Sequence, residues 1–353
     1  MARGLNGFIV FFFTVSAFPF VMEICGAKWR STINAIWGTG FTIGGMLLSW
    51  PFAFYLSNWH DLHFAISFLM VPAALASLVI PESYKWYISQ DRTQEAKDSA
   101  LKLAITQKNL SETEKTRLLD VVEEISATSR SLREENGKNK LGFFVVFKFR
   151  KMTLITLNFM FQWFVNSFAY YGLALNAGNL PGTDIVNNMI LCGLEIPAYL
   201  LMPFLMDNKK IGRRRYLAYG LVLAGLCCVA STILLEFKSC EAGAAELSGQ
   251  IFAYLGKFFV AGTFQAIYIH TAEAYSTDVR ADCIGLCSVS ARLGGIIAPF
   301  VLSTADIASW MPGMMFGVVS VVSGLAAFFL PETLGQPMLY TIEEAEKWHS
   351  RVI

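Results

Sequence analysis

Long apolar runs with almost no charge set the strongest limit on how this chain can fold. Nine stretches are long enough to cross a bilayer as helices, at residues 4–22, 31–57, 62–81, 152–175, 185–206, 216–236, 249–273, 281–303 and 307–331. A crossing helix needs roughly 20 apolar residues, and backbone inside lipid must satisfy its own hydrogen bonds. We therefore expect an all-α polytopic membrane protein.

The distribution of charge supports a membrane protein and argues against several other classes. Only 16% of the residues are charged, whereas a soluble domain carries about 25%. Half of the 28 Lys and Arg lie within residues 81–151. The formal net charge of +1 shows no basic excess, so we expect no nucleic-acid partner.

No motif of an enzyme, a metal site or a cofactor site stands out in the sequence. The Gly294-Gly295 pair lies inside an apolar stretch with no Lys and Ser or Thr after it, so it is no phosphate-binding loop. The four His have no metal-ligand spacing, and we interpret His270 as a packed helix residue. We expect no enzyme activity, no metal and no cofactor.

Basic residues in the connections predict the orientation of the chain. Lys and Arg gather in one alternating set of connections, which includes 82–151 and 207–215, and in the tail after 331. Cytoplasmic loops carry such an excess. We therefore expect four domains, which are a partial transmembrane bundle at 1–81, a cytoplasmic helical linker at 82–151, a six-helix bundle at 152–331 and a cytoplasmic tail at 332–353.

The first and last spans resemble each other at one offset of 250 residues. The matching groups are Glu23 with Glu273, Arg30 with Arg280, Pro81-Glu82 with Pro331-Glu332, and Gly44-Gly45 with Gly294-Gly295. Parallel repeats of this kind relate two six-helix transporter halves. On this interpretation, three further helices would precede residue 1. Within the linker we expect helices at 92–108 and 111–127, the second opened by a capping box of Ser111 and Glu114.

Five segments resemble major facilitator organic-ion transporters of the cation, anion and zwitterion (carnitine) type. They are Pro81-Glu82-Ser83-Tyr84-Lys85-Trp86, Gly212-Arg213-Arg214, residues 271–280 (TAEAYSTDVR), residues 291–299 (ARLGGIIAP) and residues 330–337 (LPETLGQP). Tyr84, Lys85 and Ser276 depart from the family pattern. The resemblance covers the family's helices four to twelve and implies the major facilitator fold, with the first three helices missing.

The resemblance implies a plasma-membrane transporter that works by alternating access on small amphipathic organic ions. A counter-ion or exchanged substrate would drive it. Two alternatives stay open. One is a truncated membrane protein of the same family that transports weakly or not at all, because one wall of the central cavity would be missing. The other is a sugar-type facilitator, since Pro-Glu-Ser and Gly-Arg-Arg segments occur there as well.

Two basic residues inside predicted spans are candidates for contact with an anionic substrate group. A charge near the bilayer centre costs roughly 2.5–3.5 kcal/mol on insertion scales, so Arg292 and Lys257 should face a cavity or a partner. The alternative is a buried ion pair of either residue with Glu195. The family resemblance favours anions or zwitterions, because its cation-preferring members carry an acid where Arg292 stands.

Aromatic residues on two spans complete the candidate substrate site. Trp163, Tyr170 and Tyr171 match the family's helix-seven aromatics, and Phe264 and Tyr268 follow Lys257 on its own face of the helix. Such rings suit amphipathic solutes, although core packing is an equal alternative for each. Polar residues of the same span, including Asn158, Gln162 and Asn166, would line either a helix contact or a cavity.

A second candidate site lies at the predicted cytoplasmic helix ends. Six charged residues there are interpreted as gating ion pairs that hold the inner gate shut: Glu23, Arg30, Glu273, Arg280, Arg213 and Arg214. The alternative is ordinary enrichment of positive charge on the cytoplasmic side.

Overall fold

The structure is a computed structural model that describes most of the chain as helices. The described residues are 29–47, 58–79, 82–89, 91–107, 111–135, 143–236, 242–276, 279–335, 345, 346 and 348. The predicted span 4–22 and the candidate gating residue Glu23 lie outside them. Contacts divide the chain into two units, one holding α2 and residues 141–353 and the other holding α4 to α7. We describe each unit by itself, and the four-domain division stays a prediction.

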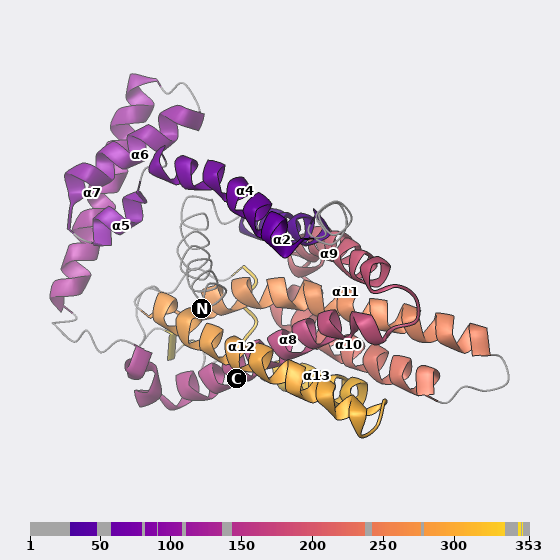
Figure 1. The fold of residues 1–353 in the computed structure, drawn as a ribbon. Helices are drawn as coiled ribbons and strands as arrows, with labels where there is room; N and C mark the ends of the chain where they lie inside the picture. The colour runs from indigo at the N-terminus through magenta and orange to yellow at the C-terminus, as the bar shows by residue number, and fades with distance from the viewer. Residues whose placement is uncertain are drawn as a thin grey trace. The chain divides into compact units, whose positions relative to one another are not determined.

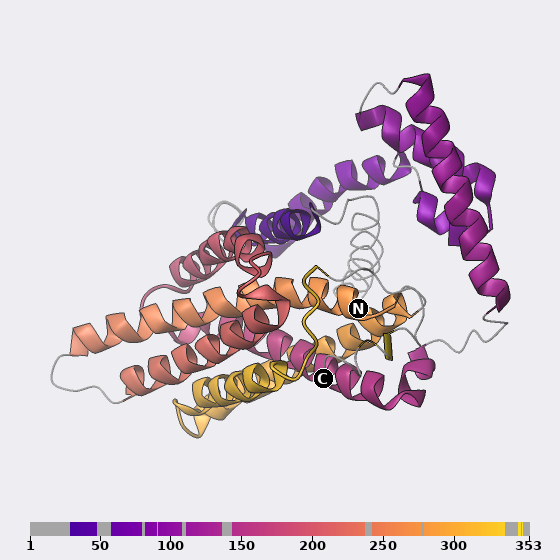
Figure 2. The ribbon, with the colours of Figure 1, turned by 180° about the vertical axis from the view of Figure 1, so that it is seen from behind.

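Within the described residues, the larger unit contains seven long helices (Figure 1). Their bounds are α2 (Arg30–Leu47), α8 (Arg150–Leu175), α9 (Asp184–Met206), α10 (Gly212–Glu236), α11 (Ala242–Ala274), α12 (Arg280–Leu302) and α13 (Met311–Ala327), with short 3₁₀ turns η3 (Phe143–Lys148), η4 (Asn176–Asn179) and η5 (Ser303–Asp306). Each predicted span between 152 and 331 coincides with one of these helices. Figure 2 shows α8, α10, α11, α12 and α13 running alongside one another.

Four of these helices are long and apolar enough to cross a membrane, among the residues that the structure describes. They are Ile185–Met206, Gly212–Glu236, Gly243–Ala274 and Arg280–Asp306. Large apolar side chains point outward on this unit: Phe204, Phe300 and Phe329 are 76%, 72% and 74% exposed. A surface of this kind is unusual in water and suits a lipid environment. The expected all-α membrane architecture is therefore confirmed.

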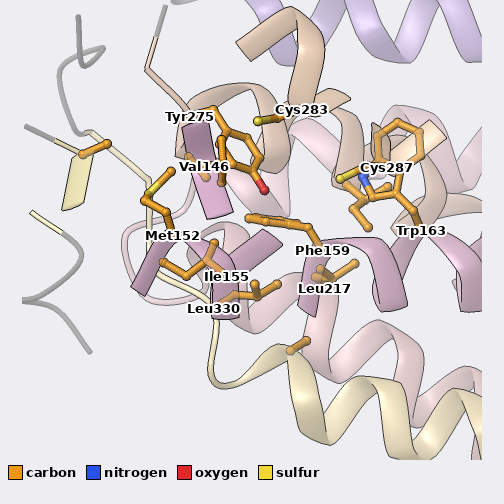
Figure 3. Close-up of a cluster of buried hydrophobic side chains, with 14 of the residues drawn as sticks. Val146, Met152, Ile155, Phe159, Trp163, Leu217, Tyr275, Cys283, Cys287 and Leu330 are labelled. Atoms are coloured by element: carbon orange, nitrogen blue, oxygen red, sulfur yellow. The ribbon is translucent and has the colours of Figure 1, made fainter. Parts of the chain in front are cut away.

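The interior of the larger unit is packed around α8 (Figure 3). Phe159 and Trp163 of α8 are fully buried, and Tyr275, which follows α11, donates its hydroxyl to the Thr156 hydroxyl at 2.8 Å. Figure 3 shows Cys287 of α12 beside Trp163. Because α8 contacts α11, α12 and α13, its side chains are held from three sides.

Glycine allows α12 to approach α8 closely. A Cβ added to Gly294 would lie 2.3 Å from the backbone oxygen of Phe164. Backbone cannot yield as a flexible side chain can, so this position admits only glycine at the observed helix spacing. Gly294 belongs to the glycine pair that the sequence repeat singled out.

Replacing Gly294 with alanine is expected to destabilise the protein by about 1–3 kcal/mol, because the added methyl group forces α8 and α12 apart. Thermal unfolding of the purified protein in detergent measures this effect. Gly285→Ala is the matched control on the same helix, since nothing lies within 4 Å of the added Cβ. Equal unfolding temperatures for the two variants would contradict the close approach.

The smaller unit contains α4 (Trp59–Val79) followed by three helices, α5 (Tyr84–Ser89), α6 (Thr93–Gln107) and α7 (Glu112–Glu135). The linker helices pack on a small core of Ile88, Ala96, Ala100 and Val122. The predicted capping box is confirmed: the Ser111 backbone N–H donates to the Glu114 carboxylate at 2.9 Å, and the Glu114 N–H donates to the Ser111 hydroxyl at 3.3 Å. Helix α7 runs to Glu135, beyond the predicted end at 127.

An ion pair joins two helices of the linker. Lys97 of α6 lies 2.6 Å from the Glu123 carboxylate of α7. This hydrogen bond, and the Lys97 charge, lower the pKa of the Glu123 carboxyl. The pair is solvent-exposed, so it orients the two helices more than it stabilises them.

The tail predicted after residue 331 returns to the larger unit. Ala345 is fully buried, and the Glu346 carboxylate accepts the backbone N–H groups of Lys151 at 3.2 Å and Met152 at 2.9 Å. The first N–H groups of a helix lack partners within it. Glu346 therefore caps α8, which has no side-chain cap of its own.

Candidate functional site

The five candidate aromatic residues form one continuous row between α8 and α11. Ring centroids lie 4.3 Å apart for Trp163 and Tyr268, 6.0 Å for Tyr268 and Phe264, 5.4 Å for Phe264 and Tyr170, and 5.3 Å for Tyr170 and Tyr171. These separations are typical of favourable aromatic pairs. The fold thus brings together the aromatic candidates of α8 and those of α11, which lie far apart in the sequence.

The members of the row differ in burial. Trp163 is fully buried and donates its indole N–H to the Thr271 hydroxyl at 2.9 Å, so it serves the core. Tyr170 is 6% exposed. Tyr171, Phe264 and Tyr268 are half-buried. The row therefore has a packed end at Trp163 and more open members at Tyr171, Phe264 and Tyr268.

Arg292 lies on α12 at the edge of this row. Its side chain is exposed, and its charge acts on the hydroxyl of Tyr268. One turn further along α12, Gly295 faces Tyr171: a Cβ there would lie 3.2 Å from the Tyr171 ring. Arg292 therefore lies near Tyr268, on a helix that approaches Tyr171 closely at Gly295.

Lys257 forms the buried ion pair that was the alternative interpretation of this residue. Its ammonium nitrogen is 3.0 Å from the Glu195 carboxylate of α9, and both side chains are 2% exposed. The same nitrogen lies 3.1 Å from the centre of the Tyr170 ring and 3.2 Å from the Tyr170 carbonyl oxygen. Lys257 is thus held between Glu195 and one member of the aromatic row.

The other Glu195 contacts were not singled out from the sequence. Its second carboxylate oxygen accepts hydrogen bonds from Thr42 of α2 at 2.8 Å and from Tyr199 of α9 at 3.0 Å. Thr42 is the counterpart of Arg292 at the repeat offset of 250 residues. This correspondence was the sequence signal that could have drawn attention to Thr42. Asn34 of α2 also reaches across, to the Gln265 carbonyl oxygen at 2.8 Å.

The polar face of α8 makes helix contacts. Asn158 donates to the Ala326 carbonyl at 2.8 Å, and Gln162 exchanges hydrogen bonds with Ser323 at 2.9 and 2.7 Å, both on α13. Asn166 accepts from the Thr263 hydroxyl of α11 at 2.8 Å. Of the two roles left open for this face, the structure shows helix-to-helix bonding.

Arg213 is the centre of the second candidate site, at one end of the bundle. Its guanidinium contacts the Asp207 carboxylate at 2.6 Å and the Glu273 carboxylate at 3.1 Å. Glu273 also accepts from the Thr333 hydroxyl at 2.8 Å, and Asp207 from the Ser31 hydroxyl at 3.2 Å. The ends of α9, α10 and α11 are thus joined through one buried arginine.

A second acid completes this cluster. The Glu332 carboxylate accepts the backbone N–H groups of Arg213 at 2.9 Å and Arg214 at 3.2 Å, so it caps α10. Gly212 makes room for it, with a φ of +70° and a Cβ position 2.4 Å from that carboxylate. Glu332 belongs to the family segment at residues 330–337, and its contact with α10 was not predicted from the sequence.

The remaining gating candidates have different partners or lie outside the described residues. Arg280 donates to the Tyr275 carbonyl at 3.1 Å, while Glu273 contacts Arg213. The side chain of Arg30 is not described, nor is Glu23.

His270 is packed as expected, with its Nε2 atom 2.8 Å from the Pro331 carbonyl oxygen and its ring against Phe159. Within the described residues, no group of three His, Cys, Asp or Glu side chains could hold a metal ion.

Comparison with known proteins relates the chain to a family of transporters. Residues 1–345 match the family model described as Sugar (and other) transporter. The chain is 30% identical over 346 residues to Solute carrier family 22 member 15 of Xenopus tropicalis, which covers 98% of this chain and 61% of that protein. It is 30% identical over 349 residues to Solute carrier family 22 member 16 of Homo sapiens, covering 99% and 58%.

A third relative is the Organic cation transporter protein of Drosophila melanogaster, 30% identical over 334 residues, covering 94% of this chain and 58% of that protein. The chain thus spans about three fifths of the length of these curated relatives. The relatives confirm the resemblance to major facilitator organic-ion transporters.

Among solved structures, the chain resembles a proton:xylose symporter of the major facilitator superfamily bound to 6-bromo-6-deoxy-D-glucose. The TM-score is 0.64 at 16% identity, with 93% of this chain and 69% of that chain covered. At this identity the likeness shows the fold alone. Since the family model covers nearly all of the sequence, the chain belongs to the Sugar (and other) transporter family of the major facilitator superfamily.

Proposed function

We propose that this protein is a plasma-membrane transporter of organic ions, with a preference for anions or zwitterions, that works by alternating access. The observation that carries the proposal is the aromatic row of α8 and α11 with Arg292 at its edge. Rings offer contact to an apolar solute body, and a guanidinium offers a planar fork to a carboxylate or sulfonate. The named relatives include an organic cation transporter, which supports organic ions as the substrate class.

Within this proposal the two cations differ in their exposure to solvent. Arg292 is exposed, so it makes the first contact with the anionic group of the substrate. Lys257 is held by Glu195 and the Tyr170 ring, so it reaches the substrate only after that ion pair opens. Tyr171, Phe264 and Tyr268 would contact the ring or chain of the substrate, while Trp163 and Tyr170 support them.

The cluster around Arg213 is proposed to be part of the inner gate. Arg213 joins the ends of three helices through Asp207 and Glu273, and Glu332 caps one of them. Ser31 of α2, which belongs to the predicted partial bundle, donates to Asp207 of this cluster at 3.2 Å, and a contact of this kind between bundles must break when they rock apart around a central site. Glu23, Arg30, Arg214 and Arg280 remain proposed members of the same gate. An exchanged substrate or an ion gradient would supply the driving force.

Uptake by the purified chain in proteoliposomes tests the proposal. Three labelled solutes distinguish the candidate functions: 3-phenylpropionate, 2-phenylethylammonium and glucose. We expect the carboxylate to enter fastest, because the ring fits the aromatic row and the charge fits Arg292. Faster uptake of glucose would favour the sugar-type facilitator, and faster uptake of the ammonium ion would contradict the anion preference. No uptake of any solute would favour the non-transporting alternative.

A further inference from the structure

Glu195 and Lys257 form a pair that is fully satisfied and excluded from solvent. One oxygen of the carboxylate contacts the ammonium at 3.0 Å, and the other accepts the hydroxyls of Thr42 and Tyr199 at 2.8 and 3.0 Å. Both charged side chains are 2% exposed. The pair as a whole is electrically neutral, which is the form in which two charges are least costly inside a protein.

Within the part of the chain that the structure describes, one positively charged group contacts Glu195. The titratable and polar groups that act on it come from α2, α8, α9 and α11. They are Thr42, Tyr170, Cys192, Tyr199 and Lys257. All five of these groups except Lys257 are neutral. Any event that draws Lys257 away therefore leaves the carboxylate with hydroxyl partners and no counter-charge from this set.

Lys257 is also the charged residue that touches the aromatic row. Its nitrogen lies 3.1 Å from the centre of the Tyr170 ring, and Tyr170 contacts both Phe264 and Tyr171. A carboxylate that enters along the row would compete with Glu195 for the same ammonium. Two carboxylates that share one ammonium repel each other, and this repulsion favours protonation of one of them.

We propose that binding of a substrate carboxylate at Lys257 is coupled to the uptake of one proton by Glu195, so that anion and proton cross the membrane together; this inference rests on the proposed function. The proton comes from water on the side from which the substrate enters. The ammonium stays protonated and exchanges the Glu195 carboxylate for the substrate carboxylate. A new O–H bond forms on Glu195, and the site gains one negative and one positive charge.

The hydroxyls around Glu195 suit both states of this exchange. A carboxylate accepts from Thr42 and Tyr199, as observed. A protonated carboxyl group has one O–H donor, and either hydroxyl oxygen can accept from it after rotation. Protonation also replaces a charge-assisted bond from Thr42 by a neutral, weaker one. Because Thr42 is on α2, proton uptake would loosen the contact between α2 and α9.

Isothermal titration calorimetry of the full chain in phosphatidylcholine nanodiscs tests the coupling directly. 3-Phenylpropionate is titrated in two buffers of different ionisation enthalpy, which gives the number of protons taken up per anion bound. We expect about one proton per anion near neutral pH, and a dissociation constant that rises about tenfold for each pH unit, as linkage requires. Binding without proton uptake by the wild-type protein would overturn the coupling and leave the proposed function standing.

Variants assign the proton to Glu195. Glu195→Gln is expected to bind the anion with no proton uptake and with a dissociation constant that does not change with pH. Asp306→Asn, an exposed acid outside the site, is the matched control and should keep one proton. Glu195→Asp should also take up one proton per anion. This variant is the alternative test if Glu195→Gln does not fold. An unchanged proton count in Glu195→Gln would overturn the assignment. Absence of binding by the wild type would overturn the proposed function together with this inference.

Discussion

Replacing Lys257 with methionine is expected to destabilise the protein by about 3–5 kcal/mol, because removal of one partner leaves a buried charge without compensation. Glu195 is 2% exposed, and among the described residues Lys257 is the cation that contacts it. The remaining hydroxyls of Thr42 and Tyr199 satisfy hydrogen bonds and supply no charge. Thermal unfolding of the purified protein in detergent and mildly alkaline buffer measures the effect.

Two further variants separate the ion pair from packing. The double variant Lys257→Met/Glu195→Gln should recover most of the lost stability, since replacing both charges of a buried pair by neutral groups is often close to neutral. Lys209→Met, at an exposed position after α9, should stay within about 0.5 kcal/mol of the wild type. If Lys257→Met has the same unfolding temperature as the wild type, Glu195 and Lys257 do not form a buried charged pair in the folded protein.

Exchanging Arg292 for aspartate is expected to weaken 3-phenylpropionate binding by about 10- to 150-fold. This range corresponds to the loss of a charged hydrogen bond of about 1.5–3 kcal/mol. The new carboxylate would also repel the substrate. The side chain is exposed, so the substitution should leave folding intact. Calorimetry on the purified variant measures the dissociation constant.

Arg292→Lys provides the control for geometry. Lysine keeps the positive charge and loses the planar fork that binds a carboxylate with two parallel hydrogen bonds. We expect this variant to bind between the wild type and Arg292→Asp. Equal affinity for all three proteins would mean that the residue at position 292 does not contact the substrate.

The membrane spans could be predicted from the sequence because length and apolar character decide them locally. The predicted spans 185–206 and 281–303 match α9 (Asp184–Met206) and α12 (Arg280–Leu302) closely. The capping box at Ser111 was equally local, since its two partners are three residues apart. The end of α7 was predicted too early, because residues 128–135 lack the apolar periodicity on which the prediction relied.

The partners of the charged residues could not be predicted in the same way. Glu195 and Lys257 lie on different helices, and whether their side chains meet depends on how α9 and α11 are rotated and spaced. The sequence therefore left a cavity cation and an ion pair as alternatives for Lys257. Arg213 shows the same limit. It was predicted as one of six gating residues, whereas its partners Asp207 and Glu273 come from the ends of α9 and α11.

The aromatic row lies between these cases. A common helical face for Lys257, Phe264 and Tyr268 follows from their spacing, and the family resemblance added Trp163, Tyr170 and Tyr171. Their ring contacts across α8 and α11 are consistent with a shared site. The burial of Trp163 was not predictable, because its Thr271 partner is on another helix.

The charge preference of uptake tests the central claim most directly, namely that Arg292 and the aromatic row bind organic anions. The measurement is the ratio of 3-phenylpropionate to 2-phenylethylammonium uptake into proteoliposomes that hold the wild type or Arg292→Asp. These two solutes share a ring and differ in the sign of their charge. We predict a ratio above one for the wild type and below one for the variant. The same ratio in both proteins would contradict the claim.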